Sequence, residues 1–357
     1  MKKGSSHQSI YILSIDIEMV RPLIAATILT FTLFAIVILP SEAQGQGRGN
    51  DLQVGFYASG CPKVEDIVAE VVARVHEQDP KLPPALLRLF FHDCFVKGCD
   101  ASILLDATSS GEPIEKASTA NGETVLRGLE VVDEIKAQVE QECPKTVSCA
   151  DILAFAAREA VYLAGLPRHN VPAGRRDSRT SRASDVDVNL PTPATPLEDI
   201  INMFTRRGLT KEDMVVLSGA HSIGKAQCTQ FTDRLYKFTP AVPRDPSLNP
   251  TYADELAGKC PAEQPPGQAL RFMVDFDPTT PLVLDNQYYL NLQKGRGLLQ
   301  SDQLMATDSG TRPIVDQMAA SNEAWGKRFI RAMIKMGRIN VLTKNEGVIR
   351  TNCRAYL

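Results

Sequence analysis

The sequence has few aromatic residues and no excess of charge of either sign. Phe, Trp and Tyr make up 6% of its 357 residues, with a single Trp, and 39 Lys and Arg nearly balance 42 Asp and Glu, so that the formal net charge is −3. Such a chain lacks the broad basic field with which proteins hold a nucleic-acid backbone, so no nucleic-acid partner is expected. Because 43% of its residues are apolar and its Gly and Pro follow no period, a disordered or collagen-like chain is also excluded.

Histidine is scarce as well, and its spacing argues against zinc. The five histidines are His7, His76, His92, His169 and His221, and none forms an H-E-x-x-H pair. The step from Cys94 to Cys99 has no second Cys or His pair at zinc-finger spacing. The sequence also has no N-x-[ST] glycosylation site without a central proline, so an N-linked glycan is not expected.

The N-terminal region carries the pattern of a secretory signal peptide. Residues 23–39 have no charge and lie between Arg21 and the small-residue segment Ser41-Glu42-Ala43. We therefore expect residues 1–43 to be a signal peptide and residues 44–357 the mature protein. Met19 lies close to the basic residue, so residues 1–18 are interpreted as an upstream extension. The alternative is a signal anchor, because a run of this length is at the lower limit for spanning a bilayer.

All eight cysteines follow the apolar run. An even number of cysteines behind a signal peptide implies disulfides. Cys94 and Cys99 bound a tight loop in which Gly98 can adopt a positive φ, so a local bridge there is sterically plausible. Spacing leaves the pairing of the other six open.

Helical periodicity dominates the rest of the chain, and strand signals are few and short. Apolar stripes at helical spacing run through residues 129–139, 153–164 and 325–336, and core packing explains all three. Pro83-Pro84 and the capping-box pattern Thr210 to Asp213 indicate two helix starts. We predict a mainly α fold with minor short β structure, and the length favours two coupled helical lobes.

The first helix start leads to a pair of side chains suited to peroxide. Arg88 and His92 lie four residues apart and therefore on one helical face. The imidazole can accept and return a proton near neutral pH, and the fixed cation stabilises negative charge on a small bound group. The alternative is a half-buried Arg and His satisfied by local carboxylates.

His221 follows an apolar run and lies among small residues, in the segment Leu217-Ser-Gly-Ala-His-Ser-Ile-Gly224. Small neighbours leave room for a flat group, and a neutral imidazole whose second nitrogen has an oriented partner is the usual axial ligand of haem iron in globins and peroxidases. The alternative is an ordinary core histidine.

The segment from Arg88 to Ser102, RLFFHDCFVKGCDAS, resembles the distal signature of the secreted plant haem peroxidases of class III. Further segments resemble that family in the same order, at residues 146–152, 174–178, 189–191, 217–221, 275–277, 284–289 and 300–302. The similarity extends over residues 51–357 and includes all eight cysteines. It implies two helical lobes enclosing one haem b, and oxidation of phenolic donors by hydrogen peroxide in successive one-electron steps. It also implies secretion to the plant cell wall, without stable membrane association after signal cleavage, and a monomer.

On the distal side of the haem, the resemblance gives roles to five residues. His92 is expected to move the peroxide proton, and Arg88 to stabilise the developing charge. Asn121, with Glu115 behind it, is expected to fix the His92 tautomer, and Phe91 to shield the iron from bulky donors.

On the proximal side, the resemblance makes His221 the axial ligand of the iron and Asp302 its hydrogen-bond partner. Phe276 is expected to pack beside the imidazole, and Pro191 to position a phenolic donor through its carbonyl. The departures are Phe90, where the family commonly has His, and Lys97, where it commonly has Asn.

The resemblance also implies two Ca²⁺ ions and four disulfides. Hard cations take several oxygen ligands from short stretches of chain. The two expected ligand sets are Asp93, Val96, Gly98, Asp100 and Ser102, and Ser222, Asp277, Thr280, Val283 and Asp285. Without the resemblance, these acids read as caps and turn residues. The implied disulfides pair Cys61 with Cys143, Cys94 with Cys99, Cys149 with Cys353, and Cys228 with Cys260.

Two other functions compete with a peroxidase. One is a calcium-stiffened wall protein with this fold and little turnover, against which the intact set Arg88, His92, Asn121, His221 and Asp302 argues. The other is a secreted zinc hydrolase that uses His92 and Asp93.

Overall fold

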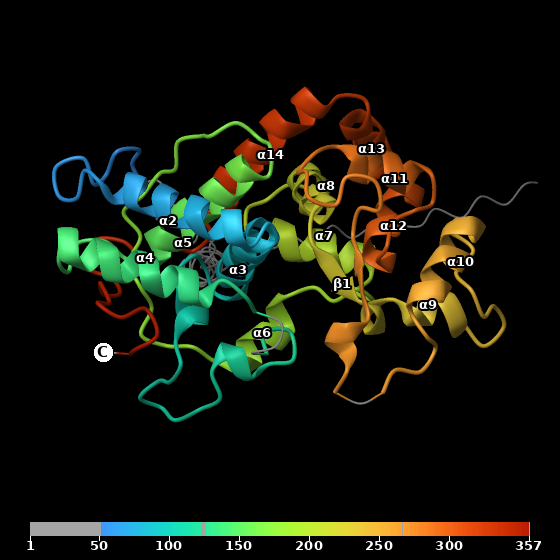
Figure 1. The fold of residues 1–357 in the computed structure, drawn as a ribbon, viewed down its shortest axis with the longest axis horizontal. Helices are drawn as coiled ribbons and strands as arrows, with labels where there is room; N and C mark the ends of the chain where they lie inside the picture. The colour runs from blue at the N-terminus through green and yellow to red at the C-terminus, as the bar shows by residue number, and fades with distance from the viewer. Residues whose placement is uncertain (1–50, 123–125, 266, 357) are drawn as a thin grey trace, which may run out of the picture. The chain divides into compact units, whose positions relative to one another are not determined.

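Helices make up almost all of the regular secondary structure in the described residues. The computed structural model describes residues 51–122, 126–265 and 267–356, which belong to one compact unit. The predicted signal peptide, residues 1–43, lies outside the described residues. The helices, labelled as in Figure 1, are α2 (Val64–Gln78), α3 (Leu82–Val96), α4 (Leu129–Glu142), α5 (Cys149–Leu163), α6 (Ala183–Asn189), α7 (Leu197–Thr205), α8 (Lys211–Ser218), α9 (Thr232–Tyr236), α10 (Pro250–Lys259), α11 (Gln287–Gln293), α12 (Gln300–Thr307), α13 (Arg312–Ala319) and α14 (Asn322–Met336).

The remaining regular structure is short, and the mainly α prediction is confirmed. Strands β1 (Lys225–Gln227) and β2 (Met273–Asp275) pair antiparallel. Single 3₁₀ turns are η3 (Ser102–Leu104), η4 (Glu115–Ala117), η5 (Gly219–Ser222), η6 (Cys228–Gln230) and η7 (Ala269–Arg271).

Local sequence signals account for where the functional helices begin. Prolines occupy the first turn of α3, where a missing N–H costs no helical hydrogen bond. Helix α8 begins with the predicted capping box, in which the Asp213 N–H donates to Thr210 Oγ1 at 3.0 Å and the Thr210 N–H donates to Asp213 Oδ2 at 2.9 Å. The three apolar stripes coincide with α4, α5 and α14.

The helices pack in two groups around a continuous apolar core. In one group, α5 packs against α2, α3 and α4; in the other, α8 packs against α7, α13 and α14, and α11 packs against α12 and α13 (Figure 1). Buried apolar side chains from both groups form a single cluster, and a smaller cluster surrounds β1, β2, α9 and α10. Helix α5 is buried on all sides from Cys149 to Val161, and its buried charged residues Asp151, Arg158 and Glu159 form ion pairs.

The four disulfides implied by the resemblance are formed, three between segments far apart in the sequence and one within a local loop. They are Cys61–Cys143, Cys94–Cys99, Cys149–Cys353 and Cys228–Cys260. The local loop has Gly98 at a φ of 150°, which a glycine adopts without steric cost.

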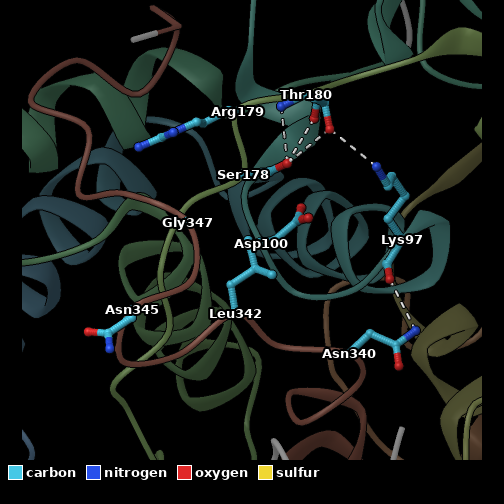
Figure 2. A pocket seen from close by; sticks show the side chains of 9 residues that line it. All are labelled: Lys97, Asp100, Ser178, Arg179, Thr180, Asn340, Leu342, Asn345 and Gly347. Atoms are coloured by element: carbon cyan, nitrogen blue, oxygen red, sulfur yellow. Dashed lines mark hydrogen bonds between the residues drawn. The ribbon is translucent and has the colours of Figure 1, made fainter. Parts of the chain in front are cut away.

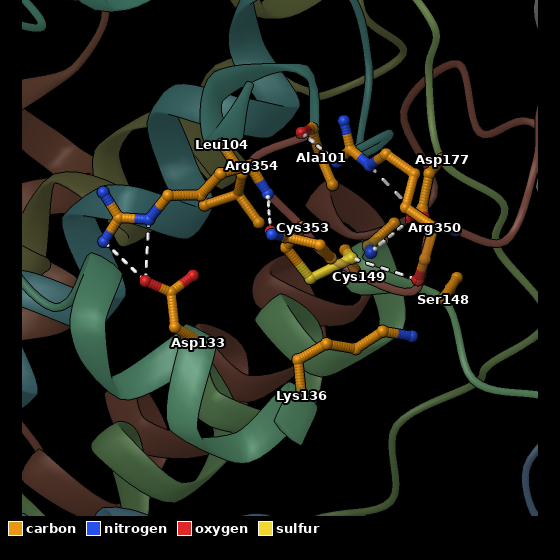
Figure 3. The surroundings of a disulfide bond; sticks show 12 residues. Ala101, Leu104, Asp133, Lys136, Ser148, Cys149, Asp177, Arg350, Cys353 and Arg354 are labelled. Atoms are coloured by element: carbon orange, nitrogen blue, oxygen red, sulfur yellow. Dashed lines mark hydrogen bonds and ion pairs between the residues drawn. A yellow bond between two sulfur atoms is a disulfide. The ribbon is translucent and has the colours of Figure 1, made fainter. Parts of the chain in front are cut away.

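The Cys149–Cys353 bridge fixes the last described residues to the first turn of α5 (Figure 3). Beside it, the Arg350 N–H donates to Asp177 Oδ2 at 2.9 Å, and the Arg350 guanidinium donates to the Ala101 carbonyl at 2.6 Å. A bridge over such a long separation reduces the entropy of the unfolded chain strongly. It therefore stabilises the folded state, and it holds Arg350 against the loop that follows α3.

In the described ranges, no helix is both long enough and apolar enough to cross a membrane.

Candidate active site

One face of α3 carries the predicted distal pair. His92 is buried, and Arg88, Pro84, Ala85 and Phe91 on neighbouring turns are half-buried, while most other α3 side chains belong to the apolar core. The Phe91 ring is tilted against Phe95, with centroids 4.5 Å apart. On one side of α3, therefore, apolar side chains and the cation Arg88 are only partly covered by the rest of the described chain.

An amide orients the distal imidazole. His92 Nδ1 lies 2.6 Å from Asn121 Oδ1, and since an amide oxygen can only accept, the Nδ1–H donates to it. Burial, followed by the nearby charge of Arg88, lowers the pKa of His92 to about 3. The ring is therefore neutral at physiological pH, and its Nε2 is left as an acceptor.

Arg88 remains a cation beside that ring. Its guanidinium donates to the Ala120 carbonyl at 2.9 Å, and burial lowers its pKa only to about 10. The distal side therefore combines a neutral base with a fixed positive charge.

The predicted link from His92 through Asn121 to Glu115 is formed only in its first half. Asn121 Nδ2 and both carboxylate oxygens of Glu115 are buried, and each lacks a hydrogen-bond partner among the described residues. Burial raises the pKa of Glu115 to about 8.

A carboxylate orients the second imidazole. His221, in η5 directly after α8, donates from Nδ1 to Asp302 Oδ1 at 3.0 Å, and Asp302 lies in the first turn of α12. The Phe276 ring stacks on the imidazole at a centroid distance of 4.3 Å and an interplanar angle of 3°. Burial opposes protonation of His221, but the charge and hydrogen bond of Asp302 outweigh it and raise the pKa of His221.

These residues fit a haem group. With Nδ1 committed to Asp302, Nε2 of His221 remains free to bind a metal, and 36% of the His221 side-chain surface is accessible. A Cβ added to Gly224 would lie 3.1 Å from Pro84 Cβ, which shows how closely the loop after His221 approaches α3.

The second predicted calcium set converges in one cluster of oxygens. Ser222 Oγ donates to the Val283 carbonyl at 2.9 Å and to Asp285 Oδ1 at 3.1 Å. Thr280 Oγ1 donates to Asp277 Oδ2 at 3.1 Å and to Asp285 Oδ1 at 3.2 Å. Carboxylates, hydroxyls and a carbonyl are the donors that Ca²⁺ prefers.

The first predicted set surrounds the loop after α3. Asp93 and Asp100 are buried, and burial together with the charge of Asp100 raises the pKa of Asp93. Asp93 Oδ1 and Ser102 Oγ are buried and lack hydrogen-bond partners among the described residues. Buried acids with unused oxygens fit a cation site. No group of three or more His, Cys, Asp or Glu side chains in the described ranges is arranged to hold a metal, so these sets depend on their hydroxyl and carbonyl oxygens.

A polar pocket of about 450 Å³ lies beside this loop and outside the two-histidine site (Figure 2). Asp100 lines it together with Lys97, Ser178, Thr180 and Asn340. Lys97 Nζ donates to Thr180 Oγ1 at 3.2 Å, and its charge acts on Asp100. The first predicted calcium set therefore lies next to an exposed cation.

Pro191 is half-buried at the end of α6. The connection from α6 to α7 reaches α12, where the Ser301 N–H donates to the Pro193 carbonyl at 3.2 Å. The predicted donor residue therefore lies on a loop anchored next to the helix of Asp302.

Comparison with known proteins shows the family of the chain. A family model described as peroxidase matches residues 68–321. The chain is 44% identical over 303 residues to "Peroxidase 5" of Vitis vinifera, covering 85% of this chain and 91% of that protein. It is 44% identical over 333 residues to "Peroxidase 72" of Arabidopsis thaliana, covering 93% and 96%. The chain belongs to the class III plant haem peroxidases.

Membership of this family establishes the reaction class. The protein is an oxidoreductase that uses haem and hydrogen peroxide to oxidise donor molecules. The resemblance inferred from the two histidine motifs is therefore confirmed.

One contact at the peroxidase site was not predicted from the sequence. The hydroxyl of Tyr288 donates to Asp302 Oδ1 at 3.0 Å, the same oxygen that accepts from His221. Tyr288 belongs to the family-like segment 284–289, but neither its type nor its spacing distinguishes it from the adjacent Tyr289.

Proposed function

We propose that the haem of this peroxidase lies between His92 and His221 and that its donors are phenols. One observation carries the proposal: the Nδ1–H of His92 donates to an amide oxygen, whereas the Nδ1–H of His221 donates to a carboxylate. When bound, haem b supplies an iron that takes up the oxidising equivalents of hydrogen peroxide and passes them on one at a time. The chain's own residues bind and orient the reactants and move the proton.

His221 is the proposed iron ligand through Nε2. Asp302 accepts the Nδ1–H, which fixes the ring and makes its other nitrogen a stronger donor. The parallel ring of Phe276 limits rotation of the imidazole.

His92 is the proposed acid-base residue. Its neutral Nε2 accepts the proton from one peroxide oxygen and returns it to the other, which departs as water while the O–O bond breaks. Arg88 stabilises the negative charge that develops, and the Asn121 oxygen keeps the proton of the ring on Nδ1. Phe91 shields this space from bulky donors.

Phenolic donors are proposed to bind at the edge of the site beside Pro191, whose carbonyl accepts their hydroxyl. The two oxygen-rich sets are proposed to hold one Ca²⁺ each, through Asp93, Val96, Gly98, Asp100 and Ser102, and through Ser222, Asp277, Thr280, Val283 and Asp285. The buried, unpartnered oxygens of the first set and the converging oxygens of the second support this.

Secretion to the cell wall as a monomer, without stable membrane association, is part of the same proposal. The apolar run at residues 23–39 and the four disulfides, which persist in oxidising compartments, support it. N-terminal sequencing of the protein exported from plant cells should give a chain that begins near residue 44. A chain retaining residues 23–39 would favour a signal anchor instead.

Reconstitution with hemin and Ca²⁺ tests the catalytic proposal. The expected result is a Soret band together with guaiacol oxidation that requires hydrogen peroxide. A haem-loaded protein without turnover would favour a calcium-stiffened wall protein. Metal analysis that finds zinc and no porphyrin would favour the hydrolase.

A further inference from the structure

Two donors share one oxygen on the proximal side of the site. The His221 Nδ1–H and the Tyr288 hydroxyl each lie 3.0 Å from Asp302 Oδ1. The two rings approach edge to face, with centroids 6.3 Å apart and an interplanar angle of 74°. Tyr288 and Asp302 are both buried, so water does not compete for this oxygen.

Only one of two adjacent tyrosines makes this contact with Asp302. Both lie in the first turn of α11 and both are buried. Tyr288 donates to Asp302, whereas Tyr289 donates to the carbonyls of Val215 and Val216 in α8, each at 2.9 Å. The neighbour is therefore a matched control, because its hydroxyl is equally buried and hydrogen-bonded but does not contact the carboxylate.

We propose that Tyr288 is a positioning residue that weakens the pull of Asp302 on the Nδ1–H of His221 and thereby sets the reduction potential of the haem iron. The inference rests on the proposed role of His221 as the iron ligand. A carboxylate oxygen has a limited negative charge, and a second donor on it draws away part of the density offered to the first. Hydrogen bonds to charged groups are strong in a buried network, so the effect of one donor on the other is large.

The direction of the effect follows from this competition. Without the tyrosine hydroxyl, Asp302 accepts more strongly from His221, the imidazole becomes more electron-rich, and the ferric iron is favoured over the ferrous iron. The native hydroxyl therefore keeps the potential higher than the His221–Asp302 pair alone would give.

Tyr288→Phe in the haem-loaded, full-length mature protein tests the proposal. Two readouts besides activity are the Fe(III)/Fe(II) equilibrium from spectroelectrochemistry and the iron–histidine stretch of the ferrous protein from resonance Raman. We expect the equilibrium to shift toward Fe(III) by up to about tenfold, which is 59 mV for one electron, and the stretch to move to higher frequency. Tyr289→Phe should leave both unchanged.

Equal values in Tyr288→Phe and the parent protein would overturn the inference. An equal shift in Tyr289→Phe would overturn it too, since the effect would then come from packing. A parent protein that binds haem without any iron–histidine stretch would overturn the proposed ligand instead, which distinguishes the two failures.

A second substitution covers the case in which Tyr288→Phe does not fold. Replacing Tyr288 with 3-fluorotyrosine keeps the ring and the hydroxyl but makes the hydroxyl a stronger donor. We expect the opposite shift, toward Fe(II). No shift, or a shift toward Fe(III), would contradict the proposal.

Discussion

The two imidazoles of the site are the same chemical group in two different environments. The Nδ1–H of His92 donates to an amide oxygen. Burial and the nearby charge of Arg88 lower the pKa of His92 to about 3. His221 donates to a carboxylate, which raises its pKa despite burial. Burial and the charge of Arg88 on one side, and the carboxylate of Asp302 on the other, therefore distinguish the proposed proton carrier from the proposed metal ligand.

The two helices that position these rings also begin differently. Helix α3 has no side-chain cap and relies on prolines in its first turn, whereas α8 has a complete capping box. The His92 ring belongs to a long helix packed on the core, whereas the His221 ring belongs to the 3₁₀ turn that follows a short helix whose start is fixed locally.

Removing the distal imidazole should have the largest effect. His92→Ala should slow the reaction of the haem with peroxide by about 10²- to 10⁴-fold, because the proton transfer loses its carrier. Stopped-flow spectroscopy measures this rate, and the Soret band should persist. His76→Ala, in α2, is the control and should react at the parent rate. An unchanged rate in His92→Ala would remove this residue from the mechanism.

Replacing the carboxylate that accepts from His221 with an amide tests the comparison of the two imidazoles at the second ring. Asp302→Asn replaces the carboxylate with an amide, as on the distal side, so the imidazole should become a weaker donor. We expect the iron equilibrium to shift toward Fe(II) by roughly tenfold or more, as measured by spectroelectrochemistry. If the potential stays at the parent value, the carboxylate does not act on the iron.

Removing the Asp213 half of the capping box of α8 should produce a smaller effect, on stability. Asp213→Ala removes the bonds to Thr210 and the ion pair with Lys335, at a cost of about 1 kcal/mol in the free energy of unfolding. Urea unfolding measures this difference. Asp254→Ala, which breaks an exposed pair with Arg244, should cost much less.

The pH dependence of that effect has a defined sign. Burial opposes ionisation of Asp213, but its hydrogen bonds and Lys335 together lower its pKa. Its ionised form therefore stabilises the folded state above an unfolded pKa of about 4, and this contribution is lost as the pH falls through the lower folded pKa. The difference between Asp213→Ala and the parent should shrink below about pH 4. A difference that grows with acid would contradict the assignment.

The smallest expected effect concerns calcium. Lys97→Asn removes a positive charge that acts on Asp100, so the first proposed calcium site should bind Ca²⁺ roughly two- to fivefold more tightly at low salt. Calcium titration should show no change at the second proposed site, which includes Asp277 and Asp285 and serves as the internal control. An equal change at both sites would point to a general charge effect.

Local signals in the sequence predicted the helices well. Pro83-Pro84 and the Thr210–Asp213 pattern act within one turn, so they determined the starts of α3 and α8 without tertiary information. The apolar stripes likewise required only a helical period. The pairing of six cysteines depended on the family resemblance, because half-cystines such as Cys149 and Cys353 are brought together only by the whole fold.

The contacts within the site could be predicted only in part. His221 and Asp302 were matched to family motifs, yet their contact spans a long stretch of chain and depends on how α8 and α12 pack. Tyr288 was missed because adjacent tyrosines in one helical turn have the same composition and burial. Only the three-dimensional direction of each side chain distinguishes the one that reaches the carboxylate.

Anomalous diffraction at the iron edge from crystals of the hemin-reconstituted protein tests the central claim most directly. The account predicts one iron bonded to Nε2 of His221, with the His92 ring on the opposite side of the porphyrin and not bonded to the metal. Iron bonded to His92, or a porphyrin that lies away from both rings, would contradict it.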